Sequence, residues 1–480
     1  MTALPVDSDH PADEAAAPHR RAIGNVPPLV WVLMVSAIAI RLAVLLLIGD
    51  PANPGSMEHH GLAVSLNLGD GFAFNESADY TQHGRYEPSS VQSPPYPLFL
   101  AVLFYVFGAN STGPYIVGVL VNVAFAAATV PALYLLIRRM ARGDGFSRRA
   151  HLAGVVACGL FTIWPTQIFA VTQLQAIVAI TFSFVAVAWL WLASLDTKKL
   201  LPWLAYGVVG CLAALTEPVL LPAMALSGVW VLFTRRLPLG LRLRNGLVLL
   251  ATAIVIIGPW TWRNYRIHDT FMPIKSTFWV NVWKGNNATD PGHSGTDRPT
   301  LTDERLAQVL ATGRDDLRQY DLLTDRQRVA LDGKTPAERE AVFGKLAKAW
   351  ISEHPDLYAK VSAKRFAKTV WWDWDHPTGY RAFYAYPISR AVLLVGTLIG
   401  LFMARRAGWR LAYVGLVAGT AVLTYTLTVT AARFGMPMEP YQFALIGLIV
   451  AGWAARNDIH TNRPKAVLNY LGGRRINAGA

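Results

Sequence analysis

The sequence has few cysteines and few charged residues for its length. Two of its 480 residues are cysteine, and 16% are charged. Cys158 and Cys211 both lie in apolar segments, where a thiol behaves as a small buried hydrophobic group, so they carry no information about the redox compartment. The chain also lacks a G-x-x-x-x-G-K-[ST] loop and a Rossmann G-x-G-x-x-G fingerprint, which excludes these two nucleotide-binding motifs. We find no internal repeat.

Long apolar runs and basic residues are what the sequence has in excess. Segments such as 29–48, 116–137 and 177–195 approach the ~20 apolar residues that cross ~30 Å of hydrocarbon. A water-soluble core would interrupt such runs with polar positions at helical period. The net charge is +13, but most Lys and Arg residues flank the apolar runs, which favours membrane topology and anionic headgroups over nucleic acid. We therefore predict an all-α polytopic membrane protein with no nucleic-acid partner.

The basic residues also predict which side of the membrane each loop occupies. Arg20 and Arg21 precede the first apolar run, and basic clusters follow the runs that end near residues 137, 195, 233 and 404. By the positive-inside rule, these loops and both termini are cytoplasmic. About ten spans satisfy the pattern if the short segment 96–107 is a juxtamembrane or re-entrant helix. The first apolar run has no small-residue cleavage site, so we expect no cleavable signal peptide.

This topology divides the chain into five parts. We predict a disordered cytoplasmic tail (1–27), an N-terminal transmembrane module (28–260) with an outer loop at 49–113, a mainly helical extracytoplasmic domain (261–386), C-terminal transmembrane helices (387–455) and a basic cytoplasmic tail (456–480). In the outer domain, apolar residues at helical spacing predict helices at 303–320, 336–354 and 357–370. Thr335 is the predicted N-cap of the second of these helices.

The polar loop after the first span is where we expect chemistry. Ser56 is a predicted N-cap of a short helix that ends at the Gly-Asp-Gly turn of residues 69–71. Glu58 then lies in the first turn of that helix. A helix N-terminus favours a carboxylate by ~0.3–1 kcal/mol whether or not it is catalytic, so both interpretations are open at this point. His59 and His60 point ~100° apart on a helix, and no metal-type spacing accompanies them.

Several segments resemble bacterial family 39 glycosyltransferases, which are relatives of protein O-mannosyltransferases and of the aminoarabinose transferase that modifies lipid A. Their order and spacing along the chain are also similar. The segments are Leu62-Ala-Val-Ser-Leu-Asn-Leu-Gly-Asp-Gly-Phe72, Ser93-Pro-Pro-Tyr-Pro-Leu-Phe-Leu100, Gly258-Pro-Trp-Thr-Trp-Arg-Asn-Tyr265 with Met272-Pro-Ile274 and Asn281-Val-Trp-Lys-Gly-Asn-Asn287, and Arg433-Phe-Gly-Met-Pro-Met-Glu-Pro440.

The resemblance implies a C-class (GT-C) glycosyltransferase of the bacterial inner membrane. Such an enzyme moves a sugar, with inversion, from a polyprenyl-phosphate donor to a lipid, polysaccharide or protein acceptor in the envelope. It implies Glu58 as the catalytic residue and Arg263 and Arg433 as ligands of the donor phosphate, a role that suits the bidentate guanidinium. The implied substrate-binding residues are His60, Arg85, Tyr96, Asn264, Asn281 and Asn286. No metal ligand is predicted, and a divalent cation remains open.

Other interpretations accompany this one. A flippase or transporter of lipid-linked sugars would show broken helices paired across two halves, and the Pro-rich segments here are not placed symmetrically. Glu217 departs from the family, which usually has a basic residue there. A carboxylate within a span costs up to ~2.5–3.5 kcal/mol, so Glu217 should lie at the outer end of a span or face a cavity. Glu217 and Glu439 are the next candidate acids after Glu58. Residues 371–374 predict an interfacial aromatic belt, with sugar stacking as the alternative.

Overall fold

The computed structural model describes residues 26–55, 58–74, 87–108, 111–141, 148–235, 237–288, 291, 323–370, 386–430 and 432–454. For Glu58, residues 386–388 and Ala432 it describes the backbone alone. Within these ranges the chain is almost entirely helical. The only two strands described are β1 (Ala73–Phe74) and β2 (Glu87–Pro88), which pair antiparallel. The predicted all-α class is confirmed for the described residues.

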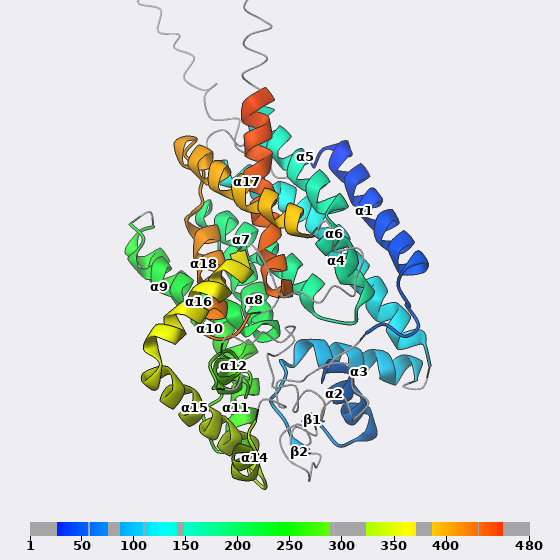
Figure 1. Cartoon of the computed structure of the whole chain (residues 1–480). Helices are drawn as coiled ribbons and strands as arrows, with labels where there is room; N and C mark the ends of the chain where they lie inside the picture. The colour runs from blue at the N-terminus through cyan, green and yellow to red at the C-terminus, as the bar shows by residue number, and fades with distance from the viewer. Residues whose placement is uncertain are drawn as a thin grey trace, which may run out of the picture.

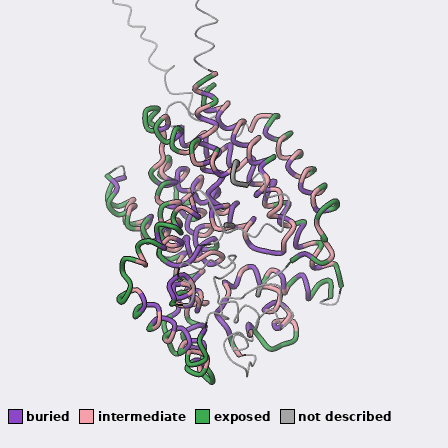
Figure 2. Tube along the Cα trace, viewed as in Figure 1, coloured by how far each residue is buried: buried purple, intermediate pink, exposed green. Residues whose placement is uncertain are grey.

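A helical bundle makes up the larger part of the molecule (Figure 1). Its members are α1 (Pro28–Leu47), α4 (Gly113–Met140), α5 (Arg148–Ile163), α6 (Pro165–Phe169), η2 (Ala170–Thr172), α7 (Ile177–Leu195), α8 (Leu200–Thr216), η3 (Pro218–Leu220), α9 (Leu221–Phe233), α10 (Leu239–Ile256), α17 (Tyr386–Arg406), α18 (Ala412–Leu427), η6 (Ala432–Met438) and a helix at 439–454. In the most apolar 18-residue stretch of each helix, 50% of the residues of α4 and 61% of those of α7 are buried, compared with 22% for α1 and 17% for α10. Helices α4 and α7 are therefore central, and α1 and α10 are more exposed. Figure 2 shows buried residues inside the bundle and exposed residues along its outer edges.

Fewer helices qualify as membrane spans than the sequence predicts. By length and composition, four described helices could cross a membrane, namely α1, α4, α7 and α10. A fifth is possible if α5 and the α6–η2 segment count as one span bent by 56°. The predicted count of about ten is therefore not confirmed, although the apolar runs at 29–48, 116–137 and 177–195 form helices α1, α4 and α7.

The bend between α5 and α6 has a local cause. Pro165 has no N–H to donate to the carbonyl of Phe161 four residues earlier. The buried guanidinium of Arg41 from α1 fills this position, because its Nη2 donates to the Phe161 carbonyl (3.2 Å) and its Nη1 to the Thr162 carbonyl (3.3 Å). An arginine within an apolar helix is tolerated because it caps backbone carbonyls that have lost their helical donors.

The remaining elements lie together at the lower end of the bundle in Figure 1. They are α2 (Glu58–Leu68), β1, β2, α3 (Pro95–Phe107), α11 (Gly258–His268), α12 (Phe278–Gly285), α14 (Asp325–Leu331) and α15 (Pro336–Glu353), while α16 (Pro355–Val370) leads back along α18 (Figure 1). The predicted helices at 336–354 and 357–370 are confirmed as α15 and α16. Thr335 caps α15 as predicted, in a capping box with Glu338. The predicted helix at 303–320 and residues 371–374 lie outside the described residues.

Helix α3 matches the short segment for which we predict a juxtamembrane position. Its 13 residues span about 20 Å at ~1.5 Å per residue, less than the ~30 Å of a hydrocarbon core. Three prolines, Pro94, Pro95 and Pro97, occupy its N-cap and first turn. They remove N–H groups that would have no partner there, which suits a helix end that starts in a poorly hydrated environment.

Candidate functional site

Helix α2 has the predicted catalytic acid as its first residue. It begins at Glu58 and ends at Leu68, and Gly69 (φ 89°) and Gly71 (φ 78°) then adopt left-handed backbone conformations as the predicted turn requires. Before α2, the carbonyl of Gly55 accepts a hydrogen bond from the Leu174 N–H (2.9 Å). This bond ties the start of the outer loop to the segment that leads into α7.

His60, a predicted substrate-binding residue, is paired within the protein. Its Nε2 is hydrogen-bonded to the hydroxyl of Tyr115 (2.9 Å), and its ring stacks on Tyr115 and meets the ring of Phe104 edge-on. Burial lowers the pKa of His60, so the imidazole is neutral at neutral pH. The ring therefore forms part of the wall between α2, α3 and α4, and its contact with substrate stays a prediction.

Arg263, a predicted phosphate ligand, holds the β1–β2 hairpin. Its Nη2 donates to the Phe72 carbonyl just before β1 (2.9 Å), and its Nη1 donates to the Ser89 carbonyl just after β2 (2.8 Å). The guanidinium also lies over the rings of Trp260 (4.5 Å) and Phe72 (5.3 Å). Both ends of the hairpin are thus fixed to α11, and phosphate binding by Arg263 stays a prediction that would require these carbonyls to share or release its donors.

Ser90, Asn264 and His268 extend this junction with complementary hydrogen bonds. Ser90 Oγ donates to Asn264 Oδ1 (2.7 Å) and is therefore left to accept from His268 Nε2 (2.9 Å). Asn264 Nδ2 donates to the carbonyls of Met272 and Ile274 (3.1 Å each). The hydrogen-bonding groups of the Asn264 side chain are used within the protein, so in this structure it braces the junction; its predicted contact with substrate is untested.

The His268 bond makes the junction sensitive to acid. Burial, followed by the nearby charges of Arg263 and Arg339, lowers the pKa of His268 to about 4. Because the unfolded chain has the ordinary pKa near 6.5, protonation favours unfolding as the pH falls from ~6.5 toward 4. We expect the thermal midpoint of the purified protein to fall between pH 7 and pH 5 less steeply in His268→Gln than in wild type. The exposed His354 provides the control, since His354→Gln should keep the wild-type slope; equal slopes in all three proteins would contradict the assignment.

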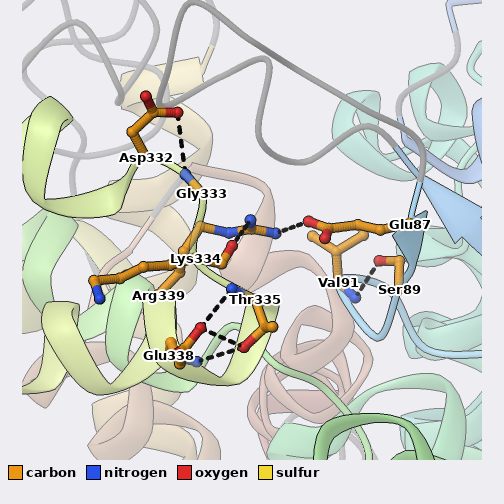
Figure 3. A network of polar contacts seen from close by, with 9 residues as sticks. All are labelled: Glu87, Ser89, Val91, Asp332, Gly333, Lys334, Thr335, Glu338 and Arg339. Carbon is orange, nitrogen blue, oxygen red and sulfur yellow. Dashed lines mark hydrogen bonds and ion pairs between the residues drawn. The ribbon is translucent and has the colours of Figure 1, made fainter.

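An ion pair between a buried arginine and a partly buried glutamate connects the same hairpin to the outer helices. Arg339 on α15 pairs with Glu87 on β2, and its Nη1 also donates to the Lys334 carbonyl (2.6 Å), as Figure 3 shows. Glu340, the next residue, accepts hydrogen bonds from the N–H groups of Trp279 and Val280 at the start of α12. Helix α15 therefore holds both the outer-loop hairpin and α12, which fixes the outer loop relative to these helices.

The other predicted polar ligands have separate positions. Asn286 is fully buried after α12, where its Oδ1 accepts from Arg365 (3.1 Å) and its Nδ2 donates to the Val282 carbonyl (2.7 Å). Asn281 lies within α12 and is partly exposed. Arg85 lies outside the described residues, as does Ser56. The binding roles of these residues stay predictions.

Arg433 and Glu217 lie near each other, together with a residue that our sequence reasoning did not consider. Glu217 is the C-cap of α8, at the end of a predicted span, and the charges of Lys275 and Arg433 both act on its carboxyl group. Lys275 also donates to Gln92 Oε1 (3.0 Å), which links it to the outer loop before α3. On η6, the guanidinium of Arg433 lies 5.6 Å from the centre of the Phe434 ring. The result is two cations and one acid where α8, η6 and the loop after α11 meet.

Glu439, the other candidate acid after Glu58, lies directly after η6 and forms a buried hydrogen-bond network. Its Oε2 accepts from Thr166 Oγ1 (2.5 Å) and Gln167 Nε2 (2.8 Å), and its Oε1 faces Arg390 Nη1 (3.3 Å). Arg390 also donates to the Thr369 carbonyl on α16 (3.0 Å). Glu439 is fully buried, so these bonds hold η6 against α6, α16 and α17.

Comparisons with known proteins bear on the fold. No protein-family model and no curated protein sequence matches the chain. Among solved structures it is similar to the Archaeoglobus fulgidus oligosaccharyltransferase tethered with an acceptor peptide containing the NVT sequon (13% identity, TM-score 0.52, 94% of this chain and 52% of that chain). The apo form of that enzyme is similar too (14% identity, TM-score 0.50, 94% and 53%). The chain thus spans about half the length of the oligosaccharyltransferase. ArnT from Cupriavidus metallidurans bound to undecaprenyl phosphate has 16% identity and a TM-score of 0.36, over 90% of this chain and 80% of ArnT.

The chain has the GT-C fold. The fold predicted from the sequence motifs is confirmed, and the apolar helices make this GT-C chain a membrane protein. Within the described residues, no group of three or more His, Cys, Asp and Glu side chains could hold a metal ion. Helix α2, the hairpin and α11 pack together through Leu62, Phe72 and Trp260. Sequence reasoning missed Lys275, Ser90, His268, Arg339 and Arg390, because their partners lie far away in the chain.

Proposed function

We propose that this chain is a glycosyltransferase that moves a sugar from a polyprenyl-phosphate donor to an envelope acceptor. One observation carries the proposal. Helix α2, with an acid as its first residue, packs against Trp260 of α11, and the segment before α3 contacts Lys275, which together with Arg433 acts on Glu217. The GT-C fold supports this function, and the absence of a nucleotide-binding motif agrees with a lipid-linked donor.

The reaction is a single displacement. The acceptor hydroxyl attacks the anomeric carbon of the sugar, and its proton passes to the Glu58 carboxylate. The bond between the anomeric carbon and the phosphate oxygen breaks, and the polyprenyl phosphate leaves with the bonding electron pair. General base catalysis of this kind contributes ~10²–10⁴ in rate. Fixed cations beside the leaving phosphate stabilise the charge that develops on it.

The contacts favour Arg433, with Lys275, over Arg263 as the ligands of that phosphate. Both terminal nitrogens of Arg263 already donate to backbone carbonyls. Arg433 and Lys275 share one acid, Glu217, and they come from different segments, so they can approach a phosphate from two sides. In this assignment Arg263 fixes the hairpin, and His60, Arg85, Asn281 and Asn286 stay in the wider substrate region.

The orientation follows from the basic loops. We place both termini in the cytoplasm of a bacterial cell, residues 261–386 outside the inner membrane, and the α2 end of the bundle at the outer face. A lipid, polysaccharide or protein acceptor would then reach Glu58 from the outer aqueous side.

A transfer assay in detergent separates an enzyme from a transporter. The purified protein is given a polyprenyl-phosphate hexose with a labelled sugar, together with envelope lipid extract as the acceptor source. An enzyme releases polyprenyl phosphate and labels the acceptor in micelles, where no sealed bilayer exists. A flippase or transporter would give no turnover in micelles, yet would move the donor across the bilayer of a proteoliposome.

Replacement of Arg433 tests the donor site. We expect Arg433→Ala to raise the donor KM ~10-fold or more and Arg433→Lys to restore part of the loss, because Lys keeps the charge but not the bidentate geometry. Arg266, an exposed arginine on α11, provides the matched control, and Arg266→Ala should leave the donor KM unchanged. An unchanged donor KM in Arg433→Ala would show that Arg433 is an interface anchor and does not bind the donor.

A further inference from the structure

Helices α10 and α11 form one helical segment. Ile257, the residue between them, has right-handed helical backbone angles. Its N–H donates to the Ala253 carbonyl (2.9 Å), and its carbonyl accepts from the Thr261 N–H (3.0 Å), so the four-residue hydrogen-bond pattern of an α-helix continues across the boundary. The side chains of α11 therefore continue the faces of α10, which is long and apolar enough to cross a membrane.

One face of this segment is exposed and apolar along its length. Gly258 belongs to it, because a side-chain carbon placed there would meet only the Ile254 side chain. With Gly258 included, its residues recur every three or four positions, which places them on one side of a helix. We call this face the α10–α11 stripe, and its exposed side chains are those of Leu243, Leu247, Leu250, Ile254, Trp262 and Tyr265.

The stripe is free of charge over the thickness of a bilayer. Arg244 lies near one end of it and Arg266 near the other. The one charged residue between them in the sequence, Arg263, turns inward and donates to the carbonyls at both ends of the hairpin. Arg266 lies 22 residues after Arg244, which corresponds to about 33 Å at ~1.5 Å per residue, close to the ~30 Å of a hydrocarbon core. The uncharged face therefore extends past α10 into α11.

Two aromatic rings occupy the α11 end of the stripe. Trp262 is 62% exposed and Tyr265 is 44% exposed, and their ring centres lie 6.2 Å apart. The guanidinium of Arg266 lies 6.0 Å from the centre of the Trp262 ring, so the apolar face ends here beside a charge. Trp and Tyr are enriched where hydrocarbon meets the lipid headgroups, because their side chains combine an apolar ring with a polar group.

We propose that Trp262 and Tyr265 contact phospholipid headgroups, so that the membrane–water interface crosses α11 at these two residues. The partner is lipid because the stripe continues the apolar face of α10 and its uncharged length matches a bilayer. The opposite face of α11 carries Asn264 and His268, whose side chains are hydrogen-bonded to Ser90 beside the hairpin. Helix α11 thereby holds the hairpin at a fixed depth, level with the headgroups. The lipid contact does not require sugar transfer, so its test is independent of the proposed function.

Spin labels on single introduced cysteines measure this depth. The full-length protein is placed in bilayer discs of phosphatidylethanolamine and phosphatidylglycerol. Oxygen concentrates in hydrocarbon and a water-soluble nickel complex in water, so the ratio of their collision rates with the label reports its depth. Wild type, whose two cysteines are buried, gives the background labelling. The labelled variants are Leu250→Cys, Ile254→Cys, Trp262→Cys, Tyr265→Cys and Asp269→Cys.

We expect oxygen collisions to exceed nickel collisions at Leu250 and Ile254, and the two rates to be comparable at Trp262 and Tyr265. At Asp269, the exposed control just after α11, nickel collisions should exceed oxygen collisions. Each aromatic variant keeps the other ring, so one position decides the result if the other variant does not fold.

Three results would overturn the proposal. A nickel excess at both aromatic positions as large as at Asp269 would place this face in water. An oxygen excess there as large as at Ile254 would place the interface beyond α11. Low collision rates with both reagents would show that protein, such as a second copy of the chain, covers the face.

Discussion

Replacing Glu58 with glutamine should lower sugar transfer by ~10²-fold or more while the protein still inserts, folds and binds donor. The change keeps the size of the side chain and an oxygen that can accept a hydrogen bond, but it removes the charge and the proton acceptor. If Glu58 only favoured the helix N-terminus, the cost would be under ~1 kcal/mol of stability with turnover nearly intact. Single-turnover rates with saturating donor, measured beside the thermal midpoint, separate these outcomes.

The matched control is Asp70→Asn. Asp70 follows α2 in the Gly-Asp-Gly turn, where its two glycine neighbours adopt positive φ and an Asp is expected on local grounds. The effect of Asp70→Asn on transfer should therefore be small. Equal and small effects from the two substitutions would show that the base is another residue. Glu217 would then be the first alternative, because Glu439 is fully buried and engaged by three side chains.

Features governed by local physics were predictable from the sequence. The limits of α2 follow from a Gly-Asp-Gly turn, and those of α15 from the Thr335 capping box and apolar residues at helical spacing. Helix α3 follows from an apolar run with prolines confined to its start. In each case the residues that determine the element are neighbours in the chain, so the pattern can be recognised without knowledge of the fold.

The junction that holds the outer loop could not be predicted in the same way. Arg263 binds the carbonyls of Phe72 and Ser89, which lie 191 and 174 residues away. Every residue has a backbone carbonyl, so the sequence does not indicate which carbonyls accept these hydrogen bonds. The same reasoning applies to Arg41, which caps α5 from 120 residues away. A lone arginine at a span end predicts an interface anchor or a phosphate ligand. The structure shows that Arg263 has a third role, in which its hydrogen bonds hold both ends of the β1–β2 hairpin.

The span count shows a different limit. Hydropathy identified the apolar runs that form α1, α4 and α7, but it could not tell that the segment around Pro165 is bent by 56° or that α8 and α18 fall below the length of a full span. The positive-inside rule counts basic loops, and it assigns a crossing to each apolar run between them. A short or bent helix between two basic loops is therefore counted as a crossing even if it does not cross the bilayer by itself.

Removing one partner of the buried ion pair between Glu439 and Arg390 should strongly lower the free energy of unfolding. Glu439→Gln keeps an acceptor oxygen for Thr166 and Gln167, but it removes the negative charge that faces the buried guanidinium of Arg390. Removing one partner of a buried pair typically costs ~3–5 kcal/mol. Because Glu439 directly follows η6, we also expect a higher donor KM through displacement of Arg433.

A double-mutant cycle separates the ion pair from general damage. Arg390→Met fills much of the same volume without a charge, so the double variant Glu439→Gln with Arg390→Met should be less destabilised than the two single effects predict. We expect a coupling energy of at least ~2 kcal/mol in reversible unfolding by a denaturing detergent in mixed micelles. Additive effects would show that the two charges contribute no net attraction. The surface pair of Asp196 with Arg139 provides the comparison, because the Asp196 carboxylate, which is 35% exposed and shared with Arg410, should give a coupling below ~1 kcal/mol.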